Sequence, residues 1–256
     1  MQKIKKLKLY WAGRTQYRKG PKHNFGDIIS PLLFNHFNIP FQEVNAPNEA
    51  NILCIGSIAQ RARSKTIILG SGIIRGKIKL KKDCEWRLVR GPRTRAAVIA
   101  NGGQCAERYG DPALLLPLIC EPAEKKEYKI GYIPHYSEIS LFKKKYNQLI
   151  KDRNNLLINV KNNDPLKVAK AITKCEYIVS SSLHGIIAAH AYGIPAAWFD
   201  LGEIDGDGTK FHDYYESVNL KAQLSTVDNP KFSSFRKDKT VHIIEAFQEI
   251  KERLEL

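Results

Sequence analysis

This 256-residue sequence lacks several features that mark particular classes of protein. No apolar run approaches the roughly 18 residues that a membrane-spanning helix needs, so we expect no such helix. The five cysteines are odd in number and include no CxxC pair, which argues against a disulfide framework or a zinc site. The segment MQKIKKLKLYWAG alternates lysine with apolar residues and lacks the continuous apolar core of a signal peptide. We therefore expect a cytoplasmic protein without a bound metal.

Acidic side chains are scarce at the start of the chain. Residues 1–95 contain 20 Lys and Arg against 5 Asp and Glu, whereas residues 96–256 contain 21 of each. The whole net charge of +15 therefore falls in the first part. Such an asymmetry indicates an anionic partner for that part, and nucleic acid, an anionic membrane surface and a phosphorylated small substrate all qualify.

Apolar strand-like runs alternate with helix-like segments along the sequence, which predicts an α/β fold with parallel sheets. The expected strands are residues 4–11, 50–55, 66–69, 86–89, 128–133, 156–160, 177–179 and 196–199. The expected helices are residues 27–37, 94–101, 139–152, 165–174, 183–192 and 241–254, although Ser30 and Pro31 would also suit the start of the first one. The charged segment CEPAEKKEYK marks a boundary between Rossmann-like domains at 1–122 and 123–256. We expect the last helix to pack back on the first half.

The segment VSSSLHGIIAAHAYGIP, residues 179–195, places three serines and a histidine between a buried strand and a helix. Ligands of open α/β sheets bind at the carboxyl ends of the strands, where helix N-termini attract anions. Ser181 and Ser182 would add hydroxyl donors, and a bound anion would favour the protonated form of His184. A capping serine and a structural histidine are the alternative. His190 lies about 240° around the helix from His184, and we expect it to pack or face solvent.

Polar residues follow other predicted strands as well. HNFGDIISPLL offers Asn24 and Asp27 beside a flexible Gly26, although Asp27 is equally suited to capping the helix. His135 ends the strand in GYIPHY, and Lys210 lies in LGEIDGDGTKFHDYY as a further anion contact.

Two more segments bear on anion binding. WRLVRGPRTRAAV places Arg90 and Arg93 at a strand-to-helix turn, where arginine suits a carboxylate or phosphate. ILGSGI lacks the full GxGxxG pattern and the Lys-Ser/Thr pair of a P-loop, so it indicates only a close backbone contact. GDPALLLP is typical of a turn followed by a buried run, and we interpret it as structural.

Taken in chain order, NFGD, the Gly-Ser-Gly loop, the arginine turn, GDPALLLP, IPH, SSSLHG and GDGTKFHDYY resemble the polysaccharide pyruvyl transferase family. The resemblance is greatest to its exopolysaccharide branch and covers roughly residues 9–217. It implies a GT-B-like fold of two Rossmann-like domains facing a cleft. It also implies transfer of the pyruvyl group of phosphoenolpyruvate to a sugar as a ketal, with release of phosphate. No cofactor is implied beyond this donor.

The resemblance implies that the histidine of SSSLHG is essential, and the chemistry of the donor suggests roles for the other candidate residues. His184 is expected to be essential as the acid that protonates the enol carbon, and two sugar hydroxyls then add at C2. Arg90, Arg93, Lys210 and the serine loop are expected to hold the donor, and Asp27 to accept a hydroxyl proton. The acceptor is expected on a lipid carrier, and the basic segments 3–8 and 75–82 are expected to contact an anionic membrane at its inner face.

Two other functions suit parts of the sequence. A GT-B glycosyltransferase that uses a nucleotide sugar would have the same fold and a different donor. A basic nucleic-acid-binding protein would suit the charge, but its basic segments lack interleaved aromatic residues and no nucleic-acid motif is present. We therefore expect no nucleic-acid partner.

Overall fold

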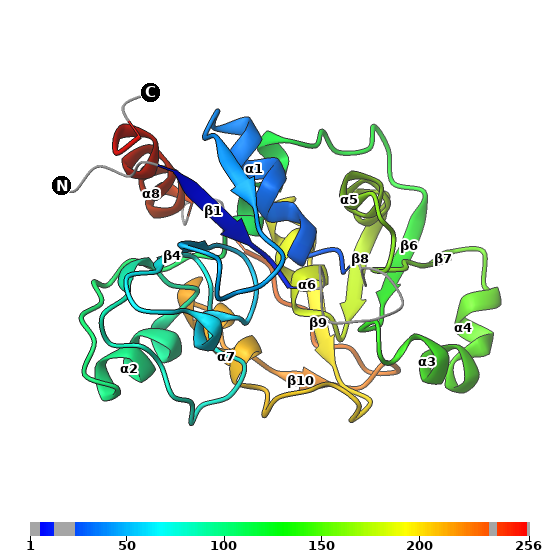
Figure 1. The fold of residues 1–256 in the computed structure, drawn as a ribbon. Coiled ribbons are helices and arrows are strands. Elements are labelled where there is room, and N and C mark those ends of the chain that lie inside the picture. Colours follow the sequence, from blue (N-terminus) through cyan, green and yellow to red (C-terminus); the bar gives the residue numbers. More distant parts are fainter. Residues whose placement is uncertain (1–5, 13–23, 236–239, 255–256) are drawn as a thin grey trace.

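Two parallel five-stranded sheets form the frame of the molecule (Figure 1). The computed structural model describes residues 6–12, 24–235 and 240–254. In the first sheet the strand order is β2 (Phe41–Glu43), β1 (Leu7–Tyr10), β3 (Ile52–Leu53), β4 (Ile67–Leu69), β5 (Glu85–Leu88). In the second it is β10 (Leu224–Ser225), β9 (Ala196–Phe199), β8 (Cys175–Ser180), β6 (Tyr128–Ile133), β7 (Asn155–Leu157). This α/β architecture confirms the expected fold class of two Rossmann-like units.

Helices connect and cover the strands of both sheets. The α-helices are α1 (Ser30–His36), α2 (Pro92–Ala100), α3 (Ile139–Lys145), α4 (Asn147–Lys151), α5 (Pro165–Thr173), α6 (Leu183–Ala191), α7 (Thr209–Ser217) and α8 (Val241–Glu252). Short 3-10 helices are η1 (Asp27–Ile29), η2 (Ala59–Arg61) and η3 (Pro112–Leu118). Every residue of α6 is buried, and this helix lies near the centre of the molecule in Figure 1.

The core is largest between the two sheets. One cluster of buried side chains combines residues of both, including Leu9 and Ile29 from the first half and Ile178 and Ile186 from the second. Two smaller clusters cover the outer face of each sheet. The strands β3, β4 and β9 are apolar and buried along their whole length, as expected for strands of a parallel sheet that is covered on both faces. The large shared core fixes the carboxyl ends of β1, β6 and β8 relative to one another.

The last helix, α8, packs against the first sheet. Phe247 stacks on Phe37 with a ring-centroid distance of 4.6 Å, and Arg253 Nη1 lies 2.7 Å from Glu85 Oε2 in β5. The expectation that this helix returns to the first half agrees with these contacts. Residues near the C-terminal end of the chain therefore complete the packing around the first sheet.

Several elements differ from the sequence expectations. The strands β2 and β10 and the helix α7 were not expected, and the helix expected over 139–152 is broken at Tyr146 between α3 and α4. The first helix does begin at Ser30 with Pro31 behind it, so the residues before it form the separate turn η1. Of the strand expected at 4–11, residues 4 and 5 lie outside the described part of the chain.

Candidate functional site

The serine loop joins the end of β8 to the start of α6. Ser180 Oγ contacts Ile133 O at 2.9 Å, and Ser181 Oγ accepts a hydrogen bond from His135 N at 2.8 Å. Two of the three serines therefore fasten this loop to the end of β6. Ser182 is the N-cap residue of α6, but its hydroxyl makes no capping bond. Ser180 and Ser181 thus stabilise the loop itself, which leaves the hydroxyl of Ser182 to contact a ligand.

His184 lies in the first turn of α6 with 9% of its side chain exposed. Its ring rests on the backbone of Gly26, since a Cβ atom on that glycine would lie 1.8 Å from Nδ1. The φ angle of Gly26 is −63°, so the glycine is required by close approach and not by its backbone conformation. The loop NFGD from the first half and the histidine from the second half therefore form one site.

Asp111 faces the other nitrogen of the same ring. Its Oδ2 lies 3.7 Å from His184 Nε2, and its Oδ1 accepts from Ala113 N at 3.0 Å to cap η3. Both Oδ2 and Nε2 are buried and lack a hydrogen-bond partner in the described residues. GDPALLLP was interpreted as a structural segment, so Asp111 was not among the predicted site residues. The only sequence signal for Asp111 was that this segment belongs to the set that resembles the family.

Asn24 and Asp27 form a second polar group beside His184. Asn24 Nδ2 donates to Asp27 Oδ2 at 3.1 Å, while Asn24 Oδ1 is buried without a partner in the described residues. Gly26, and not Asp27, is the N-cap residue of η1, so the capping interpretation of Asp27 is wrong. Burial raises the pKa of Asp27, although the charge of His184 and the Asn24 hydrogen bond oppose this. A carboxyl group with a raised pKa suits proton transfer.

Two further predicted residues, His135 and Lys210, lie near this group. Burial, followed by the charges of Lys210 and His184, lowers the pKa of His135 to about 3, so this imidazole is neutral at pH 7. Its Nδ1 lies 2.7 Å from Ser137 Oγ. Burial, followed by the charge of Arg90, lowers the pKa of Lys210 to about 8. The Lys210 ammonium lies over the Phe211 ring and has no ion pair within the described residues.

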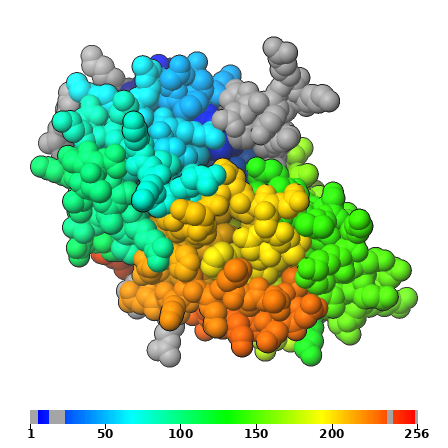
Figure 2. Space-filling view, turned by 90° about the horizontal axis from the view of Figure 1, so that it is seen from below, coloured from blue at the N-terminus to red at the C-terminus, as the bar shows by residue number. Residues whose placement is uncertain are grey.

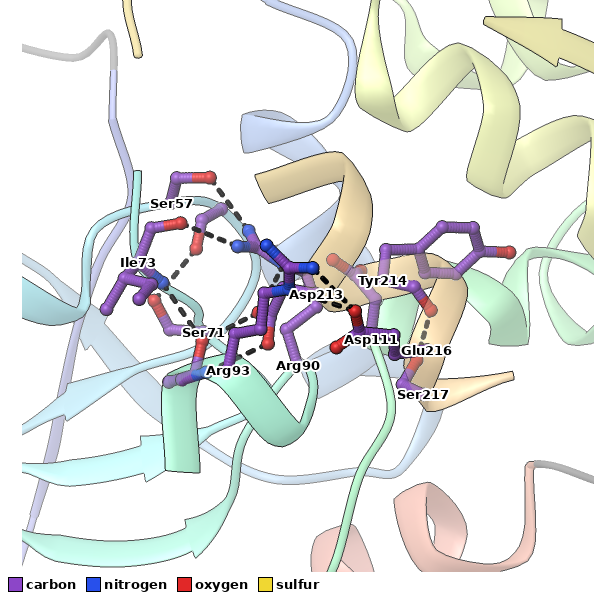
Figure 3. Close-up of polar contacts among 12 residues, drawn as sticks. Ser57, Ser71, Ile73, Arg90, Arg93, Asp111, Asp213, Tyr214, Glu216 and Ser217 are labelled. Atoms are coloured by element: carbon purple, nitrogen blue, oxygen red, sulfur yellow. Dashed lines mark hydrogen bonds and ion pairs between the residues drawn. The ribbon is translucent and has the colours of Figure 1, made fainter. Parts of the chain in front are cut away.

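Arg90 is enclosed between the two halves (Figure 3). Its Nε lies 3.1 Å from Asp213 Oδ2 on α7, and its other two nitrogens donate to Ser57 Oγ at 2.7 Å and Ile73 O at 2.6 Å. The side chains of Arg90 and Asp213 are both fully buried. The guanidinium therefore already has three partners, which leaves its assignment to the donor a prediction.

Asp213 also caps the helix that follows Arg90. The N-cap residue of α2 is Gly91, which has no side chain to offer, and Asp213 Oδ1 accepts from Thr94 N at 2.8 Å instead. A Cβ atom on Gly91 would lie 1.9 Å from Asp213 O, so a glycine is needed for α7 to come this close. Arg93 pairs with Glu216 of α7 at 2.7 Å on the exposed rim of the same contact. Its assignment to the donor likewise stays a prediction.

The loop before α7 completes this contact between the halves. Asp207 Oδ2 accepts from Gly76 N at 3.0 Å, and hydrogen bonds from Thr209 and Gly76 lower the pKa of Asp207 to about 2. Arg75 pairs with Asp205 beside it. In Figure 2 the cyan and teal surface of the first half runs directly against the yellow and orange surface of the second. The GDG segment therefore docks on the first half.

The arrangement brings together an acid, a cation, a neutral imidazole and acceptors that have no partner among the described residues, near the carboxyl ends of β6 and β8. Lys210 and the N-terminal end of α6 suit an anion, and His184 beside Asp111 suits protonation of a ligand. Asp27 and the free Asn24 Oδ1 suit a hydroxyl donor. Six of the predicted catalytic and substrate-binding residues lie in or beside this group: Asn24, Asp27, His135, Ser182, His184 and Lys210. The other three are held by protein partners: Arg90, Arg93 and Ser181.

Comparison with known proteins adds independent information. The family model described as polysaccharide pyruvyl transferase matches residues 3–203. An uncharacterized protein of Acanthamoeba polyphaga mimivirus is 35% identical over 172 residues, which is 65% of this chain and 60% of that protein. The succinoglycan biosynthesis protein ExoV of Rhizobium meliloti (strain 1021) is 29% identical over 194 residues, 71% of this chain and 58% of that protein. The chain thus spans about three fifths of the length of each relative.

Proposed function

Because the chain belongs to the polysaccharide pyruvyl transferase family, we propose that it transfers the pyruvyl group of phosphoenolpyruvate to two hydroxyls of a sugar. The product is a ketal, and phosphate is released. The acceptor we propose is a sugar of a polysaccharide precursor on a lipid carrier, and the similarity to a succinoglycan biosynthesis protein supports this class. The single observation that carries the proposal is His184, held between Gly26 and the carboxylate of Asp111.

Donor binding falls to the cationic side of the site. The donor has a carboxylate and a phosphate. Lys210 provides a buried ammonium that forms no ion pair within the described residues. Ser182 and the N-terminal end of α6 add neutral donors. His135, neutral at pH 7, offers a polar contact without competing for the proton of His184. We assign Arg90 to holding α7, the helix that carries Lys210, because its guanidinium already has three protein partners.

The chemistry requires that a proton be added to C3 of the donor and that two protons be removed from the hydroxyls of the acceptor. His184 protonates C3 of the enol, which leaves a cationic centre at C2. One sugar hydroxyl adds to C2, phosphate leaves, and the second hydroxyl closes the ketal. One hydroxyl proton returns to His184 and the other leaves with phosphate, so the proton balance closes. Asp27, with its raised pKa, accepts one of the two hydroxyl protons and passes it to the departing phosphate.

The deciding experiment compares donors. Purified protein is incubated with phosphoenolpyruvate and a panel of lipid-linked or free oligosaccharides, and phosphate release is measured with each acceptor. Parallel reactions contain UDP-sugars in place of phosphoenolpyruvate. Phosphate release that depends on an acceptor, with a mass gain of one pyruvyl ketal, supports the proposal. Sugar transfer from a UDP-sugar, with no reaction of phosphoenolpyruvate, contradicts it and favours the glycosyltransferase alternative.

We also propose that the basic first half attaches reversibly to an anionic membrane. The structure has no helix, among its described residues, that is long and apolar enough to cross a membrane. Residues 3–5 lie outside those residues, but the lysines of segment 75–82 are all exposed: Lys77, Lys79, Lys81 and Lys82. Each would contribute on the order of 1 kcal/mol near an anionic surface, and salt would weaken the attraction.

Vesicle co-sedimentation tests this attachment. We expect binding to anionic vesicles at low salt, loss of binding at high salt, and none to neutral vesicles. Replacing the four lysines by glutamine should abolish binding. A matched control replaces four exposed lysines of the second half by glutamine: Lys143, Lys144, Lys145 and Lys151. Equal loss in both variants would mean that net charge, and not this segment, governs binding.

A further inference from the structure

We propose that Asp111 holds the Nε2–H group of His184 and thereby makes Nδ1 the nitrogen that exchanges the proton with the donor. Asp111 is a positioning residue in this scheme, and His184 is the catalytic acid. The role of Nδ1 in the reaction rests on the proposed function. The orientation of the imidazole and its tautomer do not, because they follow from the contacts of the ring alone.

The first argument is the match between two unpartnered atoms. Asp111 Oδ2 and His184 Nε2 are both buried, both without a hydrogen-bond partner in the described residues, and 3.7 Å apart. An unpaired buried polar group is costly, so two such groups facing one another indicate an interaction that tightens in a later state. Catalytic hydrogen bonds are often long before the substrate binds and shorten in the complex.

The second argument is that Asp111 is itself fixed. Its Oδ1 accepts from Ala113 N at 3.0 Å and caps η3, so the carboxylate cannot rotate freely. The side chain is fully buried, and Oδ2 is left pointing at the imidazole. A carboxylate can only accept a hydrogen bond, so it selects the tautomer that carries hydrogen on Nε2. The cap of η3 therefore orients the carboxylate that orients His184.

Nε2 of His184 is closed to a ligand, which leaves Nδ1. An imidazole has two nitrogens, and Nε2 is fully enclosed beside Asp111, so no ligand reaches it. The exposed 9% of the His184 side chain must lie elsewhere on the ring. Nδ1 is the remaining nitrogen, on the side of the ring that rests on Gly26. The donor would therefore approach His184 from the NFGD loop, which also supplies Asp27 and the unpaired Asn24 Oδ1.

Other charged groups around His184 agree with this division. Asp27 interacts electrostatically with the histidine from the first half, and His135 does so from the end of β6. His135 is neutral at pH 7 because burial lowers its pKa to about 3. Lys210 acts on both Asp27 and His135. Only Asp111, among the groups of the described residues, is within 4 Å of a ring nitrogen as an ion-pair partner.

A spectroscopic experiment tests the tautomer without any assay of activity. The protein is labelled with ¹⁵N at its seven histidines, and long-range ¹H–¹⁵N correlations are recorded across the pH range. The signals of His184 are identified by their loss in His184→Ala. We expect the neutral ring to carry its proton on Nε2. In Asp111→Asn the amide nitrogen replaces Oδ2 and donates, so we expect the proton on Nδ1. An Nδ1–H tautomer in the unchanged protein would overturn the proposal.

Kinetics then test the consequence for the reaction. Asp111→Asn keeps the capping oxygen but selects the wrong tautomer, and an analogous change in a protease triad lowers kcat about 10⁴-fold. We expect a fall in kcat of roughly 10²–10⁴-fold, with the Michaelis constant for phosphoenolpyruvate nearly unchanged. The matched control is Asp164→Asn, which alters the cap of α5, where Asp164 Oδ1 accepts from Leu166 N at 3.0 Å. This control should retain the original kcat.

The outcomes separate this inference from the proposed function. If the unchanged protein does not react with phosphoenolpyruvate, the function fails while the spectra still decide the tautomer. If it reacts and folded Asp111→Asn keeps near-original kcat, the role of Asp111 is wrong although the function stands. If Asp111→Asn does not fold, as thermal unfolding would reveal, the spectrum of the unchanged protein decides alone.

Discussion

Two buried pairs of a basic side chain and a carboxylate, Arg90–Asp213 and His184–Asp111, differ in how well their atoms are paired. In the Arg90–Asp213 pair, three guanidinium nitrogens and both carboxylate oxygens have protein partners. In the His184–Asp111 pair, the facing nitrogen and oxygen are 3.7 Å apart and neither has a hydrogen bond in the described residues. A fully paired group holds structure, whereas an unpaired one is placed for a partner that arrives later. The degree of pairing thus separates scaffold from site.

Both pairs depend on a glycine that admits a close neighbour. Gly91 makes room for the backbone of Asp213, and Gly26 makes room for the ring of His184. In each case the glycine and the charged residue come from different halves of the chain. The two contacts therefore have similar local geometry, and only the pairing of the polar atoms distinguishes them.

Removing the unpaired histidine should have the largest effect on turnover. We expect His184→Ala to lower kcat by at least about 10³-fold, because the acid that protonates the donor is lost. Its free energy of unfolding should fall only by the packing that the imidazole loses, since Nε2 makes no hydrogen bond with the described residues. Phosphate release and urea unfolding measure the two quantities. A folded variant with near-original turnover would show that His184 is not the acid.

Breaking the paired cluster should act on stability instead. Asp213→Asn leaves the Arg90 charge buried without a counter-charge, which costs about 3–5 kcal/mol of unfolding free energy. Arg93→Ala is the control: its partner Glu216 lies on the same helix, but that pair is half exposed and worth under about 1 kcal/mol. Urea unfolding of both variants measures the contrast. Similar losses in both would mean that burial of the pair is not what matters.

A methyl group on Gly26 tests whether the site needs this close approach. A Cβ atom there would lie 1.8 Å from His184 Nδ1, so Gly26→Ala must push the ring away from the donor. A displacement of this size lowers turnover by about 10²-fold. Gly76→Ala is the control, because its φ is not in the left-handed region and a Cβ atom there would lie 3.4 Å from its nearest neighbour, Thr209 Oγ1, an ordinary van der Waals distance. Turnover that falls equally in both variants would contradict the proposed contact.

The smallest expected effect concerns pH and Lys210. Its pKa is lowered to about 8, so the ammonium is charged below that pH and loses its proton above it. Donor affinity should therefore weaken as the pH rises through about 8, seen as a falling limb of kcat/KM for phosphoenolpyruvate. Lys210→Arg keeps a charge at all these pH values and should remove that limb. An unchanged limb in the variant would assign it to another group.

Much of the fold could be predicted from the sequence because strand and helix patterns alternate regularly. The helix α6 is a long, mostly apolar run and the strand β8 ends in a short one, and both elements were predicted to within a few residues. The helix α7 was missed because its segment TKFHDYYES is polar on average and follows a Gly- and Asp-rich turn, so the whole segment was interpreted as a loop. Its Asp213 and Tyr214 are both buried, so tertiary contacts stabilise this helix where local pattern does not.

The residues of the candidate site that directly follow a strand were the easiest to predict. His135, Ser182 and His184 follow β6 and β8 directly, and strand ends are readable from sequence. The partners of Arg90 could not be predicted from the sequence, because Asp213 lies 123 residues further along the chain. Asp111 was missed for a similar reason: a Gly-Asp-Pro turn is ordinary until the fold places it against a histidine 73 residues later.

The cap that Asp213 places on α2 has a consequence for the order in which the protein is made. Residues 90–94 leave the ribosome long before α7. Until α7 has been synthesised, the Arg90 guanidinium and the Thr94 N–H lack the Asp213 carboxylate that binds both of them in the folded protein. Burying the Arg90 charge without its carboxylate would be costly. The first half therefore cannot complete its packing around Arg90 until Asp213, 119 positions after Thr94, has been synthesised. We expect a nascent chain stalled before residue 213 to resist proteolysis less well around α2 than one released just beyond it.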